Sequence, residues 1–150
     1  MSTPAVRVSE DLRAAMKSGQ KVRLAALRML ATSIRNREVE LRRDLSEEEF
    51  LEVVAREVKR RKEAAEAYDG AGREELAARE REEQDALEAY LPAALSDEEV
   101  AGLIEEAVAA TGASGPGDMG KVMSHVMGKA RGRVDGSVIS ARVRERLAGG

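Results

Sequence analysis

The residues best suited to chemistry are four cations near the C-terminal end of the chain: Lys121, Lys129, Arg131 and Arg133. Lysine and arginine both bind phosphate oxygens, and arginine does so through a planar fork of donors. Gly128 and Gly132 lie in the same segment, and a glycine lets another backbone approach closely because it has no Cβ. The spacing predicts a nucleic-acid-binding surface made by these four cations.

A second interpretation of this segment stays open. The glycines can act only as helix stops, and the arginines can interact with the negative end of the preceding helix. No aromatic residue lies nearby, whereas single-stranded RNA usually stacks on aromatic side chains. A nucleic acid bound here is therefore expected to be a structured RNA whose backbone is read.

The sequence offers no catalytic constellation. His125 is the only histidine, and a lone imidazole is a poor metal site and is more simply a structural or surface residue. Asp118 and Asp135 are better explained as helix N-caps than as a carboxylate pair. The chain has no cysteine, no phosphate-binding glycine loop and no Gly-x-Ser-x-Gly elbow. We therefore expect no catalytic residue, no metal and no cofactor.

Two helices must position the four cations. The first helix is predicted by an apolar stripe with helical spacing: Met119, Val122, Met123, Val126 and Met127. We expect this stripe to belong to a core. This helix should stop at Gly128. After the basic link, Asp135 should cap a second helix with the stripe Ile139, Val143 and Leu147.

Composition favours an all-α protein. The 150 residues are 35% charged and only 2% aromatic, with a net charge of −3. Residues 1–43 hold ten basic and four acidic side chains, residues 74–106 hold two and twelve, and residues 112–150 hold seven and three. No apolar run reaches the ~20 residues that span a bilayer, and no signal peptide is apparent. With no cysteine, these features suit a cytoplasmic protein without a membrane or metal partner.

Four helices are expected in the N-terminal part. After a lead-in over residues 1–8, Ser9 should cap a helix that ends at Gly19. The second helix should cover residues 21–42, and a capping box of Ser46 and Glu49 should open the third, which ends near residue 69. The fourth helix, residues 73–89, should be half exposed, because Glu80 and Glu83 interrupt its apolar seam.

Charged faces on these helices have two interpretations. A stripe on the second helix repeats every seven residues: Lys21, Arg28, Arg35 and Arg42. It can face phosphates or an acidic partner, or it can be a solvated face that pairs with the acidic middle of the chain. The third helix carries a basic patch, which we expect to pair within the helix: Arg56, Lys59, Arg60, Arg61 and Lys62.

Residues 93–95 form the expected domain boundary. Ser96 and Glu99 should make a second capping box, and the fifth helix should end at Gly112, followed by a flexible connector over residues 112–117. The sequence thus predicts an N-terminal helical bundle with long helices, residues 1–92, and a C-terminal three-helix module, residues 93–150. The module is small for independent stability and is expected to dock on the bundle.

Several segments resemble a known family. Gly120-Lys121-Val122-Met123, the basic link and the sequence Arg-Val-Arg-Glu-Arg-Leu at 142–147 are similar to the tail domain of the B subunit of tRNA-dependent amidotransferase. Arg28-Met29-Leu30, residues 57–61, residues 71–73, Tyr90-Leu91-Pro92 and Leu95-Ser96 resemble stand-alone proteins of the GatB/YqeY family. The resemblance implies a tRNA-reading tail module without the catalytic parts of the amidotransferase.

The sequence and this resemblance lead to one main hypothesis and two alternatives. The main hypothesis is a non-catalytic accessory protein that docks on tRNA or a tRNA-handling enzyme through the basic segment. One alternative is a protein-interaction or regulatory adaptor that uses the acidic fourth helix or the basic second helix. The other, a carbon–nitrogen ligase with glutamine as amido donor, follows only from the family's name. The oligomeric state is not predicted.

Overall fold

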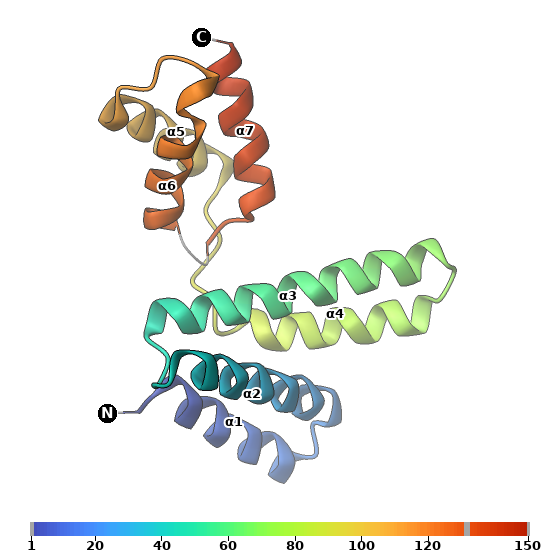
Figure 1. Cartoon of the computed structure of the whole chain (residues 1–150). Helices are drawn as coiled ribbons and strands as arrows, with labels where there is room; N and C mark the ends of the chain where they lie inside the picture. Colours follow the sequence, from blue (N-terminus) through green and yellow to red (C-terminus); the bar gives the residue numbers. More distant parts are fainter. Residues whose placement is uncertain (1, 131–132, 150) are drawn as a thin grey trace. The chain divides into compact units, whose positions relative to one another are not determined.

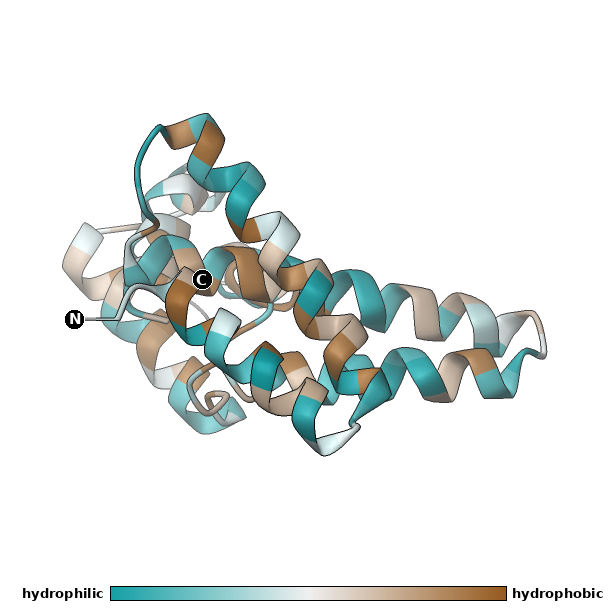
Figure 2. Ribbon diagram, turned by 90° about the horizontal axis from the view of Figure 1, so that it is seen from below, coloured by the Kyte–Doolittle hydropathy of each residue, from teal (hydrophilic) through white to brown (hydrophobic). Residues whose placement is uncertain are grey.

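The computed structural model describes residues 2–130 and 133–149, and these residues fold into seven α-helices and one 3₁₀ turn without a strand. The all-α class predicted from composition is confirmed. The chain divides into two compact units, Met1–Leu91 and Pro92–Gly150, each with its own core (Figure 1). Along the helices apolar residues recur among polar ones, as expected for helices that bury one side (Figure 2).

The first unit contains α1 (Pro4–Ser18), α2 (Lys21–Leu41), α3 (Glu47–Gly70) and α4 (Glu74–Glu88). Helix α2 packs against α1, α3 and α4, and α3 and α4 form a long antiparallel hairpin (Figure 1). The core takes buried side chains from all four helices and from the loop before α3: Val8, Ala15, Ala26, Leu27, Leu30, Ile34, Leu45, Phe50, Val53, Val54 and Leu87.

Helix α1 begins earlier than the sequence analysis predicted. Residues 4–8 are helical instead of forming a lead-in, and Val8 is fully buried. Thr3 is the N-cap, because its Oγ1 accepts a hydrogen bond from the backbone N–H of Val6 at 3.2 Å. Pro4 suits the first helical position, where its missing N–H costs nothing. The predicted stop at Gly19 is confirmed by its left-handed φ of 70°.

Tyr90 closes the first unit. Its hydroxyl donates a hydrogen bond to Asp11 Oδ2 on α1, and its ring meets the Phe50 ring edge-on with centroids 5.7 Å apart. Burial, followed by the hydrogen bond to Asp11, raises the pKa of Tyr90 well above its usual range. The Arg7 guanidinium lies over the Phe50 ring, 5.4 Å from its centroid, and forms an ion pair with Glu47.

The second unit contains α5 (Asp97–Thr111), the 3₁₀ turn η1 (Pro116–Asp118), α6 (Met119–Ala130) and α7 (Gly136–Ala148). Its core is formed by the three α-helices: Val100, Ile104, Ala107, Val122, Val126, Ala130, Ile139, Val143 and Leu147. Met119, Met123 and Met127 are partly buried against this core, so the methionine stripe is confirmed as part of it. Gly112, with φ of 67°, ends α5 as predicted.

The prediction that α6 stops at Gly128 is wrong. The helix continues to Ala130, and Gly128 is absent from the glycines that adopt a positive φ in the described chain. Ala130 is fully buried and lies one helical turn beyond Val126, so it extends the apolar stripe. That packing outweighs the cost of a helical glycine, about 1 kcal/mol relative to alanine.

Both predicted capping boxes are confirmed. Ser46 and Glu49 open α3, and Ser96 and Glu99 open α5, each with reciprocal side-chain-to-backbone hydrogen bonds. Glu49 also binds the guanidinium of Arg43, with Arg43 Nη1 2.6 Å from Glu49 Oε1. The hydrogen bonds from Arg43 and then from the Ser46 backbone lower the pKa of Glu49 to about 2.

Candidate nucleic-acid interface

Three of the four predicted binding residues lie in the described chain, and two of them, Lys129 and Arg133, lie where α6 ends and the link to α7 begins. Lys121 lies in the first turn of α6 and is exposed, with Nζ 3.7 Å from Asp118 Oδ1. Lys129 lies in the last turn of the same helix, two turns further on. Arg133 follows the helix, whereas Arg131 and Gly132 lie outside the described residues. We call Lys121, Lys129, Arg131 and Arg133 the junction cations.

Arg133 fixes the path of the chain between the helices. Its backbone N–H donates to the Ala130 carbonyl at 2.9 Å, and its own carbonyl accepts from the Leu95 N–H at 3.0 Å. Its Nε donates to the Ala93 carbonyl at 3.0 Å. A hydrogen bond from the Ser96 backbone lowers the pKa of Glu99, and the charge of Arg133 adds to that effect. Arg133 therefore has a structural role alongside any binding role.

Acidic side chains of α5 neutralise cations of α6 and α7. Lys129 Nζ forms an ion pair with Glu106, and Arg146 Nε lies 2.5 Å from Glu105 Oε1. These cations, as hydrogen-bond donors, lower the pKa of Glu106 and of Glu105. Arg142 of α7 has its Nη1 3.7 Å from Oδ1 of Asp97, the first residue of α5. The sequence analysis missed this pairing because the partners are more than 20 residues apart, as with Lys129 and Glu106 at 23.

The two aspartates near the junction differ in role. Asp135 caps α7 as predicted, with its Oδ1 accepting from the Ser137 N–H at 2.9 Å. Asp118 does not cap α6 from outside the helix, because it belongs to η1 and its Oδ2 accepts from the Ser114 N–H at 2.9 Å. This hydrogen bond is the largest cause of the lowered pKa of Asp118.

His125 lies in the middle of α6. The residue is partly buried, and its Nε2 atom is enclosed without a hydrogen-bond partner. A general base is normally held by a hydrogen bond from its other ring nitrogen to a carboxylate or carbonyl and faces a nucleophile. Within residues 2–130 and 133–149, no group of three or more His, Cys, Asp or Glu side chains is arranged to hold a metal ion.

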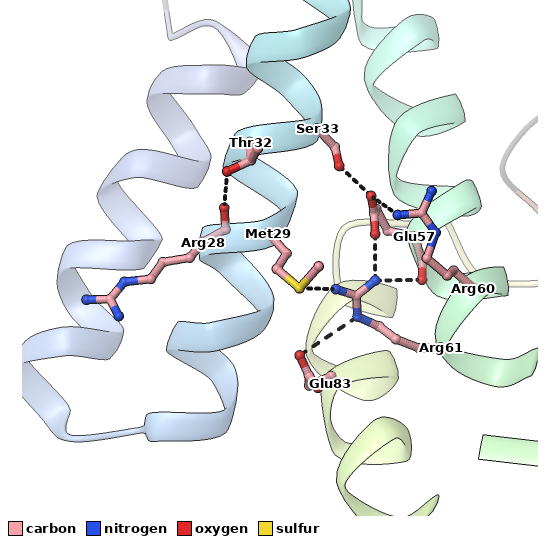
Figure 3. Close-up of polar contacts among 8 residues, drawn as sticks. All are labelled: Arg28, Met29, Thr32, Ser33, Glu57, Arg60, Arg61 and Glu83. Carbon is pink, nitrogen blue, oxygen red and sulfur yellow. Dashed lines mark hydrogen bonds and ion pairs between the residues drawn. The ribbon is translucent and has the colours of Figure 1, made fainter. Parts of the chain in front are cut away.

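A buried charge cluster in the first unit was not predicted (Figure 3). Arg61 was expected in a basic patch that pairs within α3, but it is 3% exposed and lies with Glu57 and Glu83 between helices α2, α3 and α4. Arg61 Nη1 donates to Glu57 Oε2 at 2.6 Å, and Arg61 Nε lies 4.0 Å from Glu83 Oε1. Ser33 of α2 donates to the other oxygen of Glu57.

The spacing along α3 carried a signal for this cluster. Residues 57 and 61 share one face with Phe50, Val54 and Ala65, so they fall on the buried stripe at helical intervals. Burial acts to raise the pKa of Glu57, but the hydrogen bonds from Ser33 and Arg61 outweigh it and lower that pKa. For Glu83 burial dominates and raises the pKa. Pairing of Arg60 and Arg61 with Glu57 confirms part of the predicted pairing within the helix.

The heptad stripe of α2 shows none of the predicted pairing with the acidic middle of the chain. Lys21, Arg28, Arg35 and Arg42 are all exposed, and none forms an ion pair with a described residue. Arg37, on the same helix but off the stripe, does form one, with its Nη1 2.8 Å from Glu40 Oε2. The four stripe cations are therefore exposed and without an ion-pair partner among the described residues.

No helix in the described part of the chain is both long and apolar enough to span a bilayer.

The sequence was compared with protein-family models and with proteins of curated function. No protein of curated function matches the sequence. The family model described as Yqey-like protein matches residues 5–147, which covers both units and all seven helices but the first residue of α1 and the last of α7. The chain belongs to the Yqey-like protein family.

Proposed function

We propose that this member of the Yqey-like family is a non-catalytic accessory protein that docks on the folded body of tRNA through the junction cations. The observation that carries the proposal is the placement of Lys129 in the last turn of α6 and of Arg133 in the link that follows it. The Lys129 side chain is 52% exposed and bound only to a surface carboxylate. The similarity of this segment to the tail domain of the tRNA-dependent amidotransferase B subunit supports the same reading.

The energetics of the Lys129–Glu106 ion pair allow exchange with a phosphate. An exposed pair of this kind contributes little to stability, because water and salt screen both charges. A phosphate can therefore replace Glu106 at small cost. The remaining acids of α5, including Glu105, oppose a polyanion, so we expect moderate affinity with a strong dependence on salt.

The test is a titration of the purified full-length chain against total tRNA at low salt and at ~0.15 M salt. The triple variant Lys121→Gln, Lys129→Gln, Arg131→Gln removes junction charge while leaving the structural contacts of Arg133 intact. The control triple Arg73→Gln, Arg79→Gln, Arg144→Gln removes the same number of charges from exposed positions elsewhere. We expect the first triple to abolish binding at the higher salt and the control to retain most of it.

The outcomes separate the alternatives. Binding that survives ~0.15 M salt and depends on the junction supports the proposal. Equal loss in both triples would indicate non-specific attraction and would overturn it. No binding at either salt would also overturn it and would favour docking on a protein, such as a tRNA-handling enzyme or another partner of an adaptor.

A further inference from the structure

The exposed face of α2 carries four cations that form no ion pair with a described residue. We define the α2 basic stripe as Lys21, Arg28, Arg35 and Arg42. Unlike Lys129 and Arg146 in the second unit, none of the four is matched by a carboxylate within residues 2–130 and 133–149. Their charge is therefore available to an external anion.

The stripe is straight and faces outward. Seven helical residues advance about 10.5 Å with a drift of only ~20°, so Lys21, Arg28 and Arg35 lie nearly in line. Arg42 follows directly after the helix as its C-cap, so the stripe spans roughly 30 Å. Ala26, Leu27 and Leu30 are fully buried on the opposite side of the helix. Figure 3 shows Arg28 extending on the side of α2 away from the Glu57–Arg61–Glu83 cluster.

The residues between the cations leave the stripe open to a phosphate backbone. Ala25 and Thr32 separate the first three cations, and Glu38, one helical turn beyond Arg35, accepts a hydrogen bond from the Leu45 backbone N–H at 3.3 Å. Thr32 Oγ1 donates to the Arg28 carbonyl at 3.1 Å, within its own helix, so the hydroxyl does not engage the arginine side chains. Three of the four cations are arginines, whose planar fork matches the geometry of a phosphate.

A polyphosphate fits this face better than a protein does. Protein interfaces need a core of apolar side chains within a polar rim, whereas Val39 is the one large exposed apolar residue on the stripe among those of the described chain. Single-stranded nucleic acid usually stacks on aromatic rings, and the stripe has none. Evenly spaced cations without a carboxylate partner or an aromatic neighbour suit the backbone of a double helix.

We propose that the α2 basic stripe is a docking surface for double-helical RNA, distinct from the junction cations. The choice of RNA rests on the proposed function, whereas the choice of a duplex backbone rests on the stripe itself. A cation that binds a phosphate releases a counterion. Log affinity falls as log salt concentration rises, and each stripe cation that binds should make this slope steeper by about 0.9.

The test uses the full-length chain and an RNA duplex longer than the roughly 30 Å stripe, with fluorescence anisotropy measured across a salt series. Arg28→Gln and Arg35→Gln should each make the salt slope shallower by about 0.9 and weaken binding at low salt. Arg37→Gln is the matched control, because it lies on the same helix and removes the same charge, but its guanidinium already binds Glu40. Its slope should not change.

Each other outcome separates the stripe from the junction. Unchanged slopes in Arg28→Gln and Arg35→Gln overturn the inference, and if the junction triple still abolishes tRNA binding, the proposed function stands alone. Shallower slopes in both stripe variants, with no effect of the junction triple, support the stripe and overturn the junction. Equal effects of Arg37→Gln and Arg35→Gln, or binding of poly-glutamate as tight as that of the duplex, also overturn the inference.

Discussion

At the scale of single residues, Arg42 is the one non-glycine residue with a left-handed backbone in the described chain, with φ of 58°. It ends α2 as the C-cap, and its backbone N–H donates to the Glu38 carbonyl. Glycine commonly fills this position, because a side chain there costs about 1–2 kcal/mol. The arginine thus keeps a cation at the end of the α2 basic stripe at the expense of stability.

Arg42→Gly should raise stability and weaken RNA binding together. Relief of the left-handed strain, about 1–2 kcal/mol, exceeds the added chain entropy of glycine in the unfolded state, about 0.5–1 kcal/mol. We therefore expect a gain of roughly 0.5 kcal/mol in the free energy of unfolding, measured by urea denaturation, with a shallower salt slope for duplex RNA. A less stable variant would mean that the Arg42 side chain contributes contacts that outweigh the strain.

The buried ion pair of Arg61 and Glu57 gives a second test at this scale. Arg61→Met leaves the 2% exposed Glu57 without its guanidinium partner, and removal of one partner from a buried pair costs about 3–5 kcal/mol. Urea denaturation should show a loss of that order. The double variant Glu57→Gln, Arg61→Met should lose less than the single variant, because no uncompensated charge remains. A mild effect of Arg61→Met alone would contradict this account.

At the scale of elements, acidic side chains of α5 form ion pairs with cations of α6 and α7. Glu106→Gln releases Lys129 from its ion pair, so tRNA should bind more tightly and with a steeper salt slope. Glu98→Gln is the control, because Glu98 is exposed on the same helix and forms no ion pair with a described residue. If both variants raise affinity equally, the effect is general charge reduction and Lys129 has no particular role.

Local rules predicted most helix boundaries and failed where distant packing decides. The stops at Gly19 and Gly112 and the capping boxes at Ser46 and Ser96 depend on a few neighbouring residues, and all are confirmed. The end of α6 depends on Ala130 entering a core completed by α5 and α7, which local sequence does not display. The helices that carry the predicted binding residues follow from local sequence, whereas the pairing of Lys129 with Glu106 on α5 is a tertiary effect.

At the scale of the whole molecule, carboxyl groups in both units have lowered pKa values: Glu49, Glu57, Asp69, Glu99, Glu105, Glu106 and Asp118. For all but Glu57 the largest cause is a hydrogen bond from a cation or a backbone N–H. A carboxyl group with a lowered pKa binds fewer protons in the folded state than in the unfolded state. Its stabilisation is present above the unfolded pKa and is lost as pH falls through the folded pKa.

The free energy of unfolding should therefore fall as pH is lowered from about 4.3, the pKa of an unfolded glutamate, toward the value of about 2 that Glu49 has in the folded chain. Glu83, whose pKa burial raises, acts in the opposite direction. Urea midpoints measured by circular dichroism across this range test the sign. Glu49→Gln should flatten part of the dependence, and a midpoint that rises on acidification would contradict the prediction.

The contact between Tyr90 and Asp11 has a consequence for synthesis on the ribosome. The two residues are 79 positions apart, and Tyr90 also packs on Phe50 in the core of the first unit. Helix α1 is translated first, but its polar anchor is among the last residues of its unit to emerge. We expect α1 and α2 to lack stable tertiary packing until about residue 90 has left the exit tunnel. The core of the first unit should then form in one late step.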